Sequence, residues 1–131
     1  MNGERLERFA EQPEVLLDPG DYALRIEEVQ IAQDLLSIRP LCMVVGGDAD
    51  GKKVCPETYD FHEGGENAAA IRNLYGWGVS KQELMSTGGD VKSIGALLEG
   101  RLGRVSLRQR ESRIGEVVNT HEPGAIEPVE Q

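Results

Sequence analysis

The chain has 131 residues of which 39% are hydrophobic, enough for one compact domain with a modest core but not for two domains. Its formal net charge is −9, and only 5% of its residues are aromatic against 16 glycines and 6 prolines, which favours short strands and turns over a helical bundle. No apolar run is long enough to span a bilayer, and the charged N-terminus is unlike a signal peptide. We therefore expect a cytoplasmic protein without membrane contacts.

The charge is distributed unevenly along the chain. Residues 101–113, RLGRVSLRQRESR, contain five arginines and one acid, whereas residues 114–131 contain four glutamates and no lysine or arginine. A cationic stretch on an acidic chain indicates a surface that binds an anion. The alternative is a solvated strand face that the surplus acids balance.

The first strand is expected after an N-terminal arm or short helix at residues 1–18. The turn signal DPGD precedes it, and an alternation of apolar residues begins at Tyr22. The alternation slips by one residue at Glu27 and Glu28, which predicts a β-bulge in a strongly bent strand.

A hairpin is expected next, with strands at about 38–45 and 52–61 joined by the turn GGDADG. Pro40 and Pro56 cannot donate ladder hydrogen bonds, so both should lie at an edge or a bulge. A symmetric turn would place Cys42 opposite Cys55. Direct cross-strand geometry strains a disulfide, so two reduced thiols are the favoured interpretation and a cross-strand bond the alternative.

Three short helices are expected between residues 66 and 100. Asn67 suits the N-cap of the first, and Ser80 with Glu83 forms a capping box for the second. Residues 90–100 form the third, which Gly100 ends.

Two further strands are expected at 104–109 and about 115–120. In the first, Val105 and Leu107 face one way while Arg104 and Arg108 face the other. Residues 121–131 contain two prolines, three acids and no periodicity, which predicts an acidic disordered tail.

This order predicts a mainly β fold with short helices: a five-stranded OB-type Greek-key barrel over residues 19–120, with a helical insert between strands 3 and 4. Such barrels bind oligonucleotides or oligosaccharides through strands 2 and 3 and loops 1-2 and 4-5. From the pattern alone, an SH3-like barrel and a small α+β sheet stay open as alternatives.

Four segments carry a resemblance to a known family: PGDYALRIEEVQ, GGDADGKKV, ENAAAIRNLYGWGVSKQEL and ALLEGRLGRVSLRQRES. In this order they resemble a phage-encoded family of OB-fold single-stranded-DNA-binding proteins, often known only as a phage domain of unknown function. The resemblance covers about residues 19–120. It implies coating of single strands in DNA replication or recombination, in the cytoplasm of the host cell. It also implies an acidic C-terminal tail that recruits replication or recombination proteins.

The predicted binding site combines cationic side chains for phosphates with aromatic side chains for stacking on bases. Its residues are Arg39, Lys52, Lys53, Tyr59, Phe61, Arg104, Arg108, Arg110 and Arg113. Because Tyr59 and Phe61 are two residues apart, they share one face, which either stacks on bases or lies in the core. Trp77 is expected to pack beneath a helix.

No pattern in the sequence points to catalysis, a cofactor or a metal. The turn GGDADGKKVCPE has a likeness to a calcium loop, but its first position is Gly46 rather than a carboxylate. Cys42, Cys55, His62 and His121 lack metal-ligand spacing, which favours two core thiols and two surface histidines. We therefore expect a binding protein and not an enzyme.

A second hypothesis assigns the acidity itself a role. An OB-fold interaction module, either an assembly factor or an inhibitor of a host nucleic-acid enzyme, would use its net charge of −9 to bind basic partners. An exposed edge strand and the region of Cys42 also leave a homodimer open.

Overall fold

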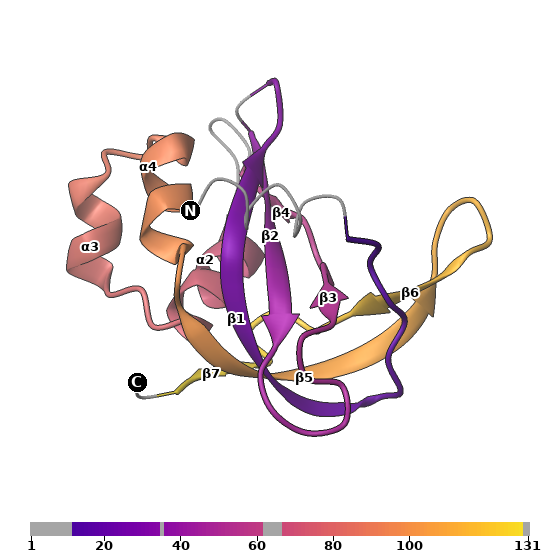
Figure 1. Ribbon diagram of the computed structural model, residues 1–131. Coiled ribbons are helices and arrows are strands. Elements are labelled where there is room, and N and C mark those ends of the chain that lie inside the picture. The colour runs from indigo at the N-terminus through magenta and orange to yellow at the C-terminus, as the bar shows by residue number, and fades with distance from the viewer. Residues whose placement is uncertain (1–11, 35, 62–66, 130–131) are drawn as a thin grey trace.

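The computed structural model describes residues 12–34, 36–61 and 67–129. These residues form a mainly β fold with seven strands and three short helices (Figure 1). The strands are β1 (Gly20–Ile31), β2 (Ser37–Val44), β3 (Lys53–Val54), β4 (Tyr59–Asp60), β5 (Leu102–Glu111), β6 (Val117–Thr120) and β7 (Ile126–Pro128). The helices are α2 (Ala68–Gly76), α3 (Lys81–Ser86) and α4 (Val91–Leu98). Within the described ranges, no helix has the length and apolar character needed to cross a membrane.

The strands form one antiparallel sheet in the order β3-β2-β1-β5-β6, with β4 also beside β2 and β7 also beside β5. Strand β1 is long and bent because it pairs with β2 along one edge and with β5 along the other. Its pairing with β2 shifts register between Ile26 and Glu28. The predicted bulge is therefore confirmed, and it lets the strand bend without losing either partner.

The expected closed barrel of five strands is not formed by the described residues. The single third strand expected at 52–61 is two short strands, β3 and β4, separated at residues 55–58. Pro56 lies in this gap, where its missing N–H cannot support a ladder. No strand pairing in the described ranges joins β3 or β4 to β6, so the sheet stays open on that side.

An extended segment at residues 12–18, which we call the N-terminal strap, lies across this open side. Glu14 forms a parallel bridge with Lys53 of β3, and the Val15 N–H donates to the Lys53 carbonyl at 3.0 Å. At the other end, Asn119 of β6 accepts from the Leu17 N–H at 3.0 Å. The described part of the expected arm or short helix is therefore extended, and residues 1–11 lie outside the described residues.

The hairpin register differs by one residue from the symmetric turn. Cys42 lies opposite Val54 rather than Cys55, because the Gly51 N–H donates to the Val44 carbonyl at 2.8 Å and closes the turn earlier. Cys42 belongs to the main core, whereas Cys55 packs with Leu41 in a separate small cluster. Both thiols are buried and free, so the cross-strand disulfide is not formed.

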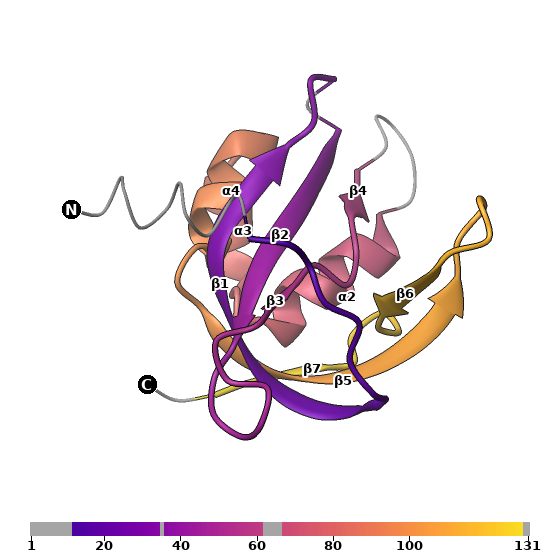
Figure 2. The ribbon, with the colours of Figure 1, turned by 45° about the vertical axis from the view of Figure 1, so that its right-hand side comes forward.

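The helical segment lies between β4 and β5, and α4 packs on β1 and β2 while α2 packs on β4 and β7 (Figure 2). The predicted capping box of Ser80 and Glu83 is present. The Asn67 side chain, in contrast, makes no capping hydrogen bond. Helix α4 lies close to β1 because Gly95 has no side chain: a Cβ there would be 3.0 Å from Ile31.

The C-terminal segment differs most from its prediction, because its described residues are ordered in the sheet and do not form a disordered tail. Strand β7 pairs with the first half of β5, and the Val129 N–H donates to the Leu102 carbonyl at 3.0 Å. Ile126 is buried, and Gly103 leaves room for it beside Trp77, since a Cβ on Gly103 would lie 2.9 Å from the indole. Burial of Ile126 and pairing with the free edge of β5 thus make residues 121–129 part of the domain. Residues 130–131 lie outside the described residues.

Candidate nucleic-acid interface

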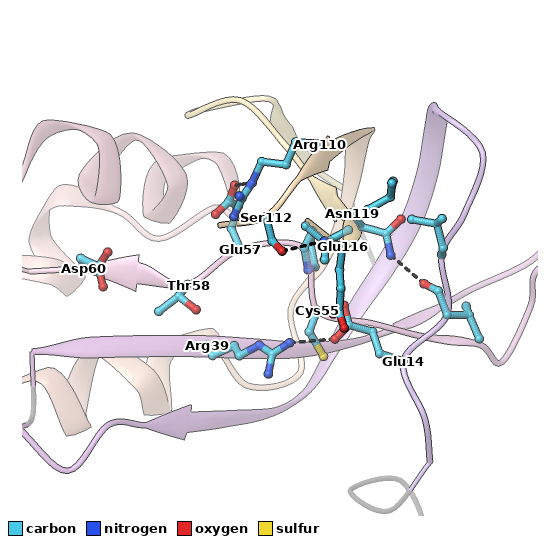
Figure 3. A pocket seen from close by; sticks show the side chains of 15 residues that line it. Glu14, Arg39, Cys55, Glu57, Thr58, Asp60, Arg110, Ser112, Glu116 and Asn119 are labelled. Atoms are coloured by element: carbon cyan, nitrogen blue, oxygen red, sulfur yellow. Dashed lines mark hydrogen bonds and ion pairs between the residues drawn. The ribbon is translucent and has the colours of Figure 1, made fainter. Parts of the chain in front are cut away.

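An open groove of about 650 Å³ lies between the N-terminal strap, the β3–β4 connection and the β5–β6 hairpin (Figure 3). Arg39 reaches it from β2 and Arg110 from β5. Both were predicted from sequence, and the sheet brings them to one groove although they are 71 residues apart in the chain.

Each of these two arginines faces a carboxylate of the same chain. Arg39 Nη2 lies 2.7 Å from Glu14 Oε1 on the strap. Arg110 Nε lies 3.9 Å from Glu57 Oε1 on the β3–β4 connection, and Glu57 also accepts from Thr120. The two pairs are partly exposed, so solvent screening makes each of them weak.

Among the described residues that line the groove, acidic side chains outnumber basic ones. Asp60 and Glu116 join Glu14 and Glu57, which gives four carboxylates against the two guanidinium groups. The sequence prediction, which selected cations, missed all four acids. The charge balance of residues 114–131 was the signal for Glu116, the likeness to a calcium loop ended on Glu57, and no local pattern distinguished Glu14.

The predicted alternation of β5 is confirmed. Val105 and Leu107 are buried, while Arg104 and Arg108 are exposed on the opposite face. Arg108 Nη1 lies 3.7 Å from Glu122 Oε1, with both side chains 65% exposed. Arg113 lies in the turn between β5 and β6, and within the described ranges neither it nor Arg104 forms an ion pair.

The remaining predicted residues lie elsewhere. Lys52 and Arg104 line a second hollow of about 680 Å³ beside the GGDADG turn. Lys53 is 7% exposed and so offers little surface to a ligand. Phe61 is half-buried and lines a third hollow beside the helices. The nine predicted residues therefore do not converge on one surface.

Tyr59 lies in the core, which answers the alternative left open by the sequence. Its side chain is 3% exposed, and its hydroxyl accepts a hydrogen bond from Trp77 Nε1 at 2.9 Å. The hydroxyl lies 3.0 Å from His121 Nε2, and His121 Nδ1 lies 2.9 Å from the Glu122 carbonyl. A carbonyl only accepts, so Nδ1 carries a proton and Tyr59 donates to Nε2. Tyr59 is committed to this network and cannot stack on a base.

His121 was expected on the surface, but it is 4% exposed. Burial lowers the pKa of His121 and raises the pKa of Tyr59, because the interior disfavours the charged form of both. No sequence pattern paired His121 with Tyr59, which lies 62 residues earlier.

Cys55 also lines the groove, but its thiol is not poised for chemistry. Burial raises the pKa of Cys55 to about 11, so the thiolate is scarce at neutral pH. Among the described residues, no group of three or more His, Cys, Asp or Glu side chains is placed to hold a metal ion.

No protein-family model matches the chain, and no curated protein matches it.

Proposed function

We propose that the protein binds single-stranded DNA without sequence preference, in phage DNA replication or recombination. One observation carries the proposal: the guanidinium groups of Arg39 and Arg110 line one groove, and exposed Arg108 and Arg113 lie on the adjacent β5–β6 hairpin. Phosphate contacts of this kind supply most of the affinity of sequence-independent binding. Because Tyr59 is buried, phosphate contacts rather than stacking would dominate.

The proposal also assigns the fold to the OB type. The path β3-β2-β1-β5-β6 supports it, because this is the neighbour order of a five-stranded OB barrel opened between its third and fifth strands. The N-terminal strap spans the position of that opening. In this interpretation the groove lies beside loop 4-5, the turn between β5 and β6, where OB folds bind oligonucleotides.

The test is a fluorescence-polarisation titration of labelled oligo-dT with the full chain at low salt. We expect binding at micromolar protein and a steep loss of affinity with salt. The triple variant Arg108→Ala, Arg110→Ala and Arg113→Ala should bind more weakly. The slope of log K against log salt should become shallower by about 2, because three single-strand phosphate contacts are lost at roughly 0.7 each.

A matched control is the triple variant Arg72→Ala, Lys81→Ala and Lys92→Ala. These side chains are exposed on α2, α3 and α4 away from the groove, and their removal changes the net charge equally. We expect a much smaller change in slope. Absence of oligo-dT binding by the wild-type protein, or equal losses in both triple variants, would overturn the proposal.

The charge of the groove favours one second candidate, an acidic interaction module that binds a basic partner. Four carboxylates against two arginines on the groove walls are the observation behind it. The same titration separates the two candidates, since this module would not bind oligo-dT at low salt.

A further inference from the structure

A second groove lies on the helical side of the molecule. It shares no described lining residue with the first groove, which Arg39 and Arg110 line. It has a volume of about 600 Å³ and lies between the β1–β2 loop, the end of β4 and helices α2 to α4. This size is within the range of about 300–1,000 Å³ typical of ligand sites. Its apolar lining residues include Leu36, Phe61, Ile71, Leu84, Met85 and Ile94.

The groove has a fixed floor and an adaptable wall. Ile94 of α4 is 3% exposed and belongs to the main core, so it forms part of a rigid base. Met85 on α3 is 70% exposed and Leu36 is 39% exposed. Helix α3 has no buried residue, and methionine is the side chain that best adapts to an apolar partner.

Among the described residues that line this groove, the charged side chains are all acidic. Asp34 and Asp90 are both exposed, and no lysine or arginine lines the groove among the described residues. Both carboxylates are oriented by the backbone: Asp34 accepts from the Leu36 N–H at 2.9 Å, and Asp90 accepts from the Ser93 N–H at 3.2 Å. Each can still accept a hydrogen bond from a ligand.

We propose that this groove docks a basic amphipathic segment of a partner protein. Apolar side chains of the segment lie over Phe61, Ile71 and Met85, and lysine or arginine side chains beside them meet Asp34 and Asp90. This is the mode in which an amphipathic helix lays its apolar face into a hydrophobic groove. Opposite charges at the rim select basic over acidic segments. The proposal does not depend on binding of single-stranded DNA.

The probe is a fluorescein-labelled amphipathic helical peptide of leucine and lysine, titrated with the full chain and followed by anisotropy. A peptide of the same pattern with glutamate in place of lysine is the specificity control. We expect saturable micromolar binding of the lysine peptide and none of the glutamate peptide. Equal binding of both peptides would overturn the proposal.

Attraction between a cationic peptide and an acidic protein must be separated from docking, and Met85→Glu does this. The variant adds a negative charge, so general attraction would strengthen binding, whereas burial of a carboxylate in the apolar interface would weaken it by about tenfold or more. Ile114→Glu is the matched control, because Ile114 is 81% exposed and lies in the β5–β6 turn. We expect this control to retain or slightly increase affinity.

A second pair of variants tests the rim. Asp34→Asn with Asp90→Asn should lower affinity more than Glu99→Gln with Glu111→Gln, which removes the same charge from exposed positions outside both grooves. Asparagine also serves as an N-cap, so α4 keeps its capping side chain.

Two further results would overturn the proposal. One is unchanged or tighter binding of the lysine peptide to Met85→Glu, which would show that docking in this groove does not occur. The other is a wild-type dimer in analytical ultracentrifugation that Met85→Glu converts to a monomer, which would make a second copy of the chain the occupant.

Discussion

His121, Tyr59 and Trp77 form a buried hydrogen-bond chain that joins three distant parts of the sequence. Trp77 Nε1 donates to Tyr59, and Tyr59 donates to His121 Nε2. If His121 gained a proton, both of its nitrogens would be donors and the Tyr59 hydroxyl would have no acceptor. Glu57 and Glu122 are the charged groups that favour this protonation, but burial outweighs them and lowers the pKa of His121.

A pH dependence of stability follows from this network. The unfolded chain takes up a proton at His121 near its ordinary pKa of 6.5, whereas the folded chain does so only at lower pH. Since the unfolded state then binds more protons, the free energy of unfolding should fall as the pH falls below about 6.5. Urea unfolding at about pH 7.5 and about pH 5.5 checks this, with a lower midpoint expected at the acidic pH.

His121→Gln is the control for this prediction, because glutamine does not titrate. The carboxylates of Glu83 and Asp90 have lowered pKa values and therefore begin to titrate only below this window. The midpoint of the variant should change less between the two pH values. An equally large change in the variant would show that His121 is not the responsible group.

At the scale of elements, the N-terminal strap takes the place that direct strand pairing would have in a closed barrel. Val15 is hydrogen-bonded to β3, and the buried side chain of Asn119 on β6 binds the strap twice. Its Oδ1 accepts from the Leu17 N–H at 3.0 Å, and its Nδ2 donates to the Val15 carbonyl at 2.6 Å. Gln109 Nε2 adds a bond to the Leu17 carbonyl at 2.8 Å.

Asn119→Ala should release this strap. Loss of both side-chain bonds leaves partly buried backbone groups without partners and should cost about 1–3 kcal/mol of unfolding free energy. Hydrogen exchange followed by mass spectrometry should show faster exchange at residues 12–18 than in the wild type. Asn119→Asp retains the acceptor for Leu17 but places a buried carboxylate oxygen against the Val15 carbonyl, so it should destabilise the strap at least as much as Asn119→Ala. Unchanged exchange at residues 12–18 in Asn119→Ala would contradict this role of the strap.

At the scale of the whole molecule, a net charge of −9 repels DNA. For DNA binding, the location of each acidic side chain therefore matters more than the total charge. Long-range repulsion is screened over about 8 Å at physiological ionic strength. Glu14 and Glu57, in contrast, lie within 4 Å of the arginines that would hold phosphates. In the proposed function, these two carboxylates would compete locally with a bound strand.

Neutralising these two competitors should strengthen binding of single-stranded DNA. We expect Glu14→Gln with Glu57→Gln to bind oligo-dT about two- to thirtyfold more tightly, since each of the two partly exposed pairs contributes about 0.2–1 kcal/mol. The control, Asp34→Asn with Glu99→Gln, changes the net charge equally outside the groove. Polarisation titrations of both variants provide the measurement. Equal gains would assign the effect to net charge, and no gain would show that these carboxylates do not compete.

The sequence by itself determined the local features of this protein, because they depend on neighbours along the chain. The bulge in β1, the capping box of Ser80 and the alternation of Val105 with Arg104 all follow from spacing and steric preference. The mainly β class and the position of the helices between β4 and β5 were predicted in the same way. Of the predicted site, local pattern correctly placed the exposed arginines of β5.

Only the tertiary structure decided which distant segments meet. Whether Tyr59 stacked on a base or lay in the core depended on Trp77 and His121, which no local pattern connects to it. The expected tail joined the sheet because β5 had a free edge and Gly103 left room for Ile126. Glu14 reached Arg39 because the N-terminal strap crosses the open side of the sheet. Long-range pairing depends on edges and cavities that exist only after the chain has folded, so spacing alone could not reveal these contacts.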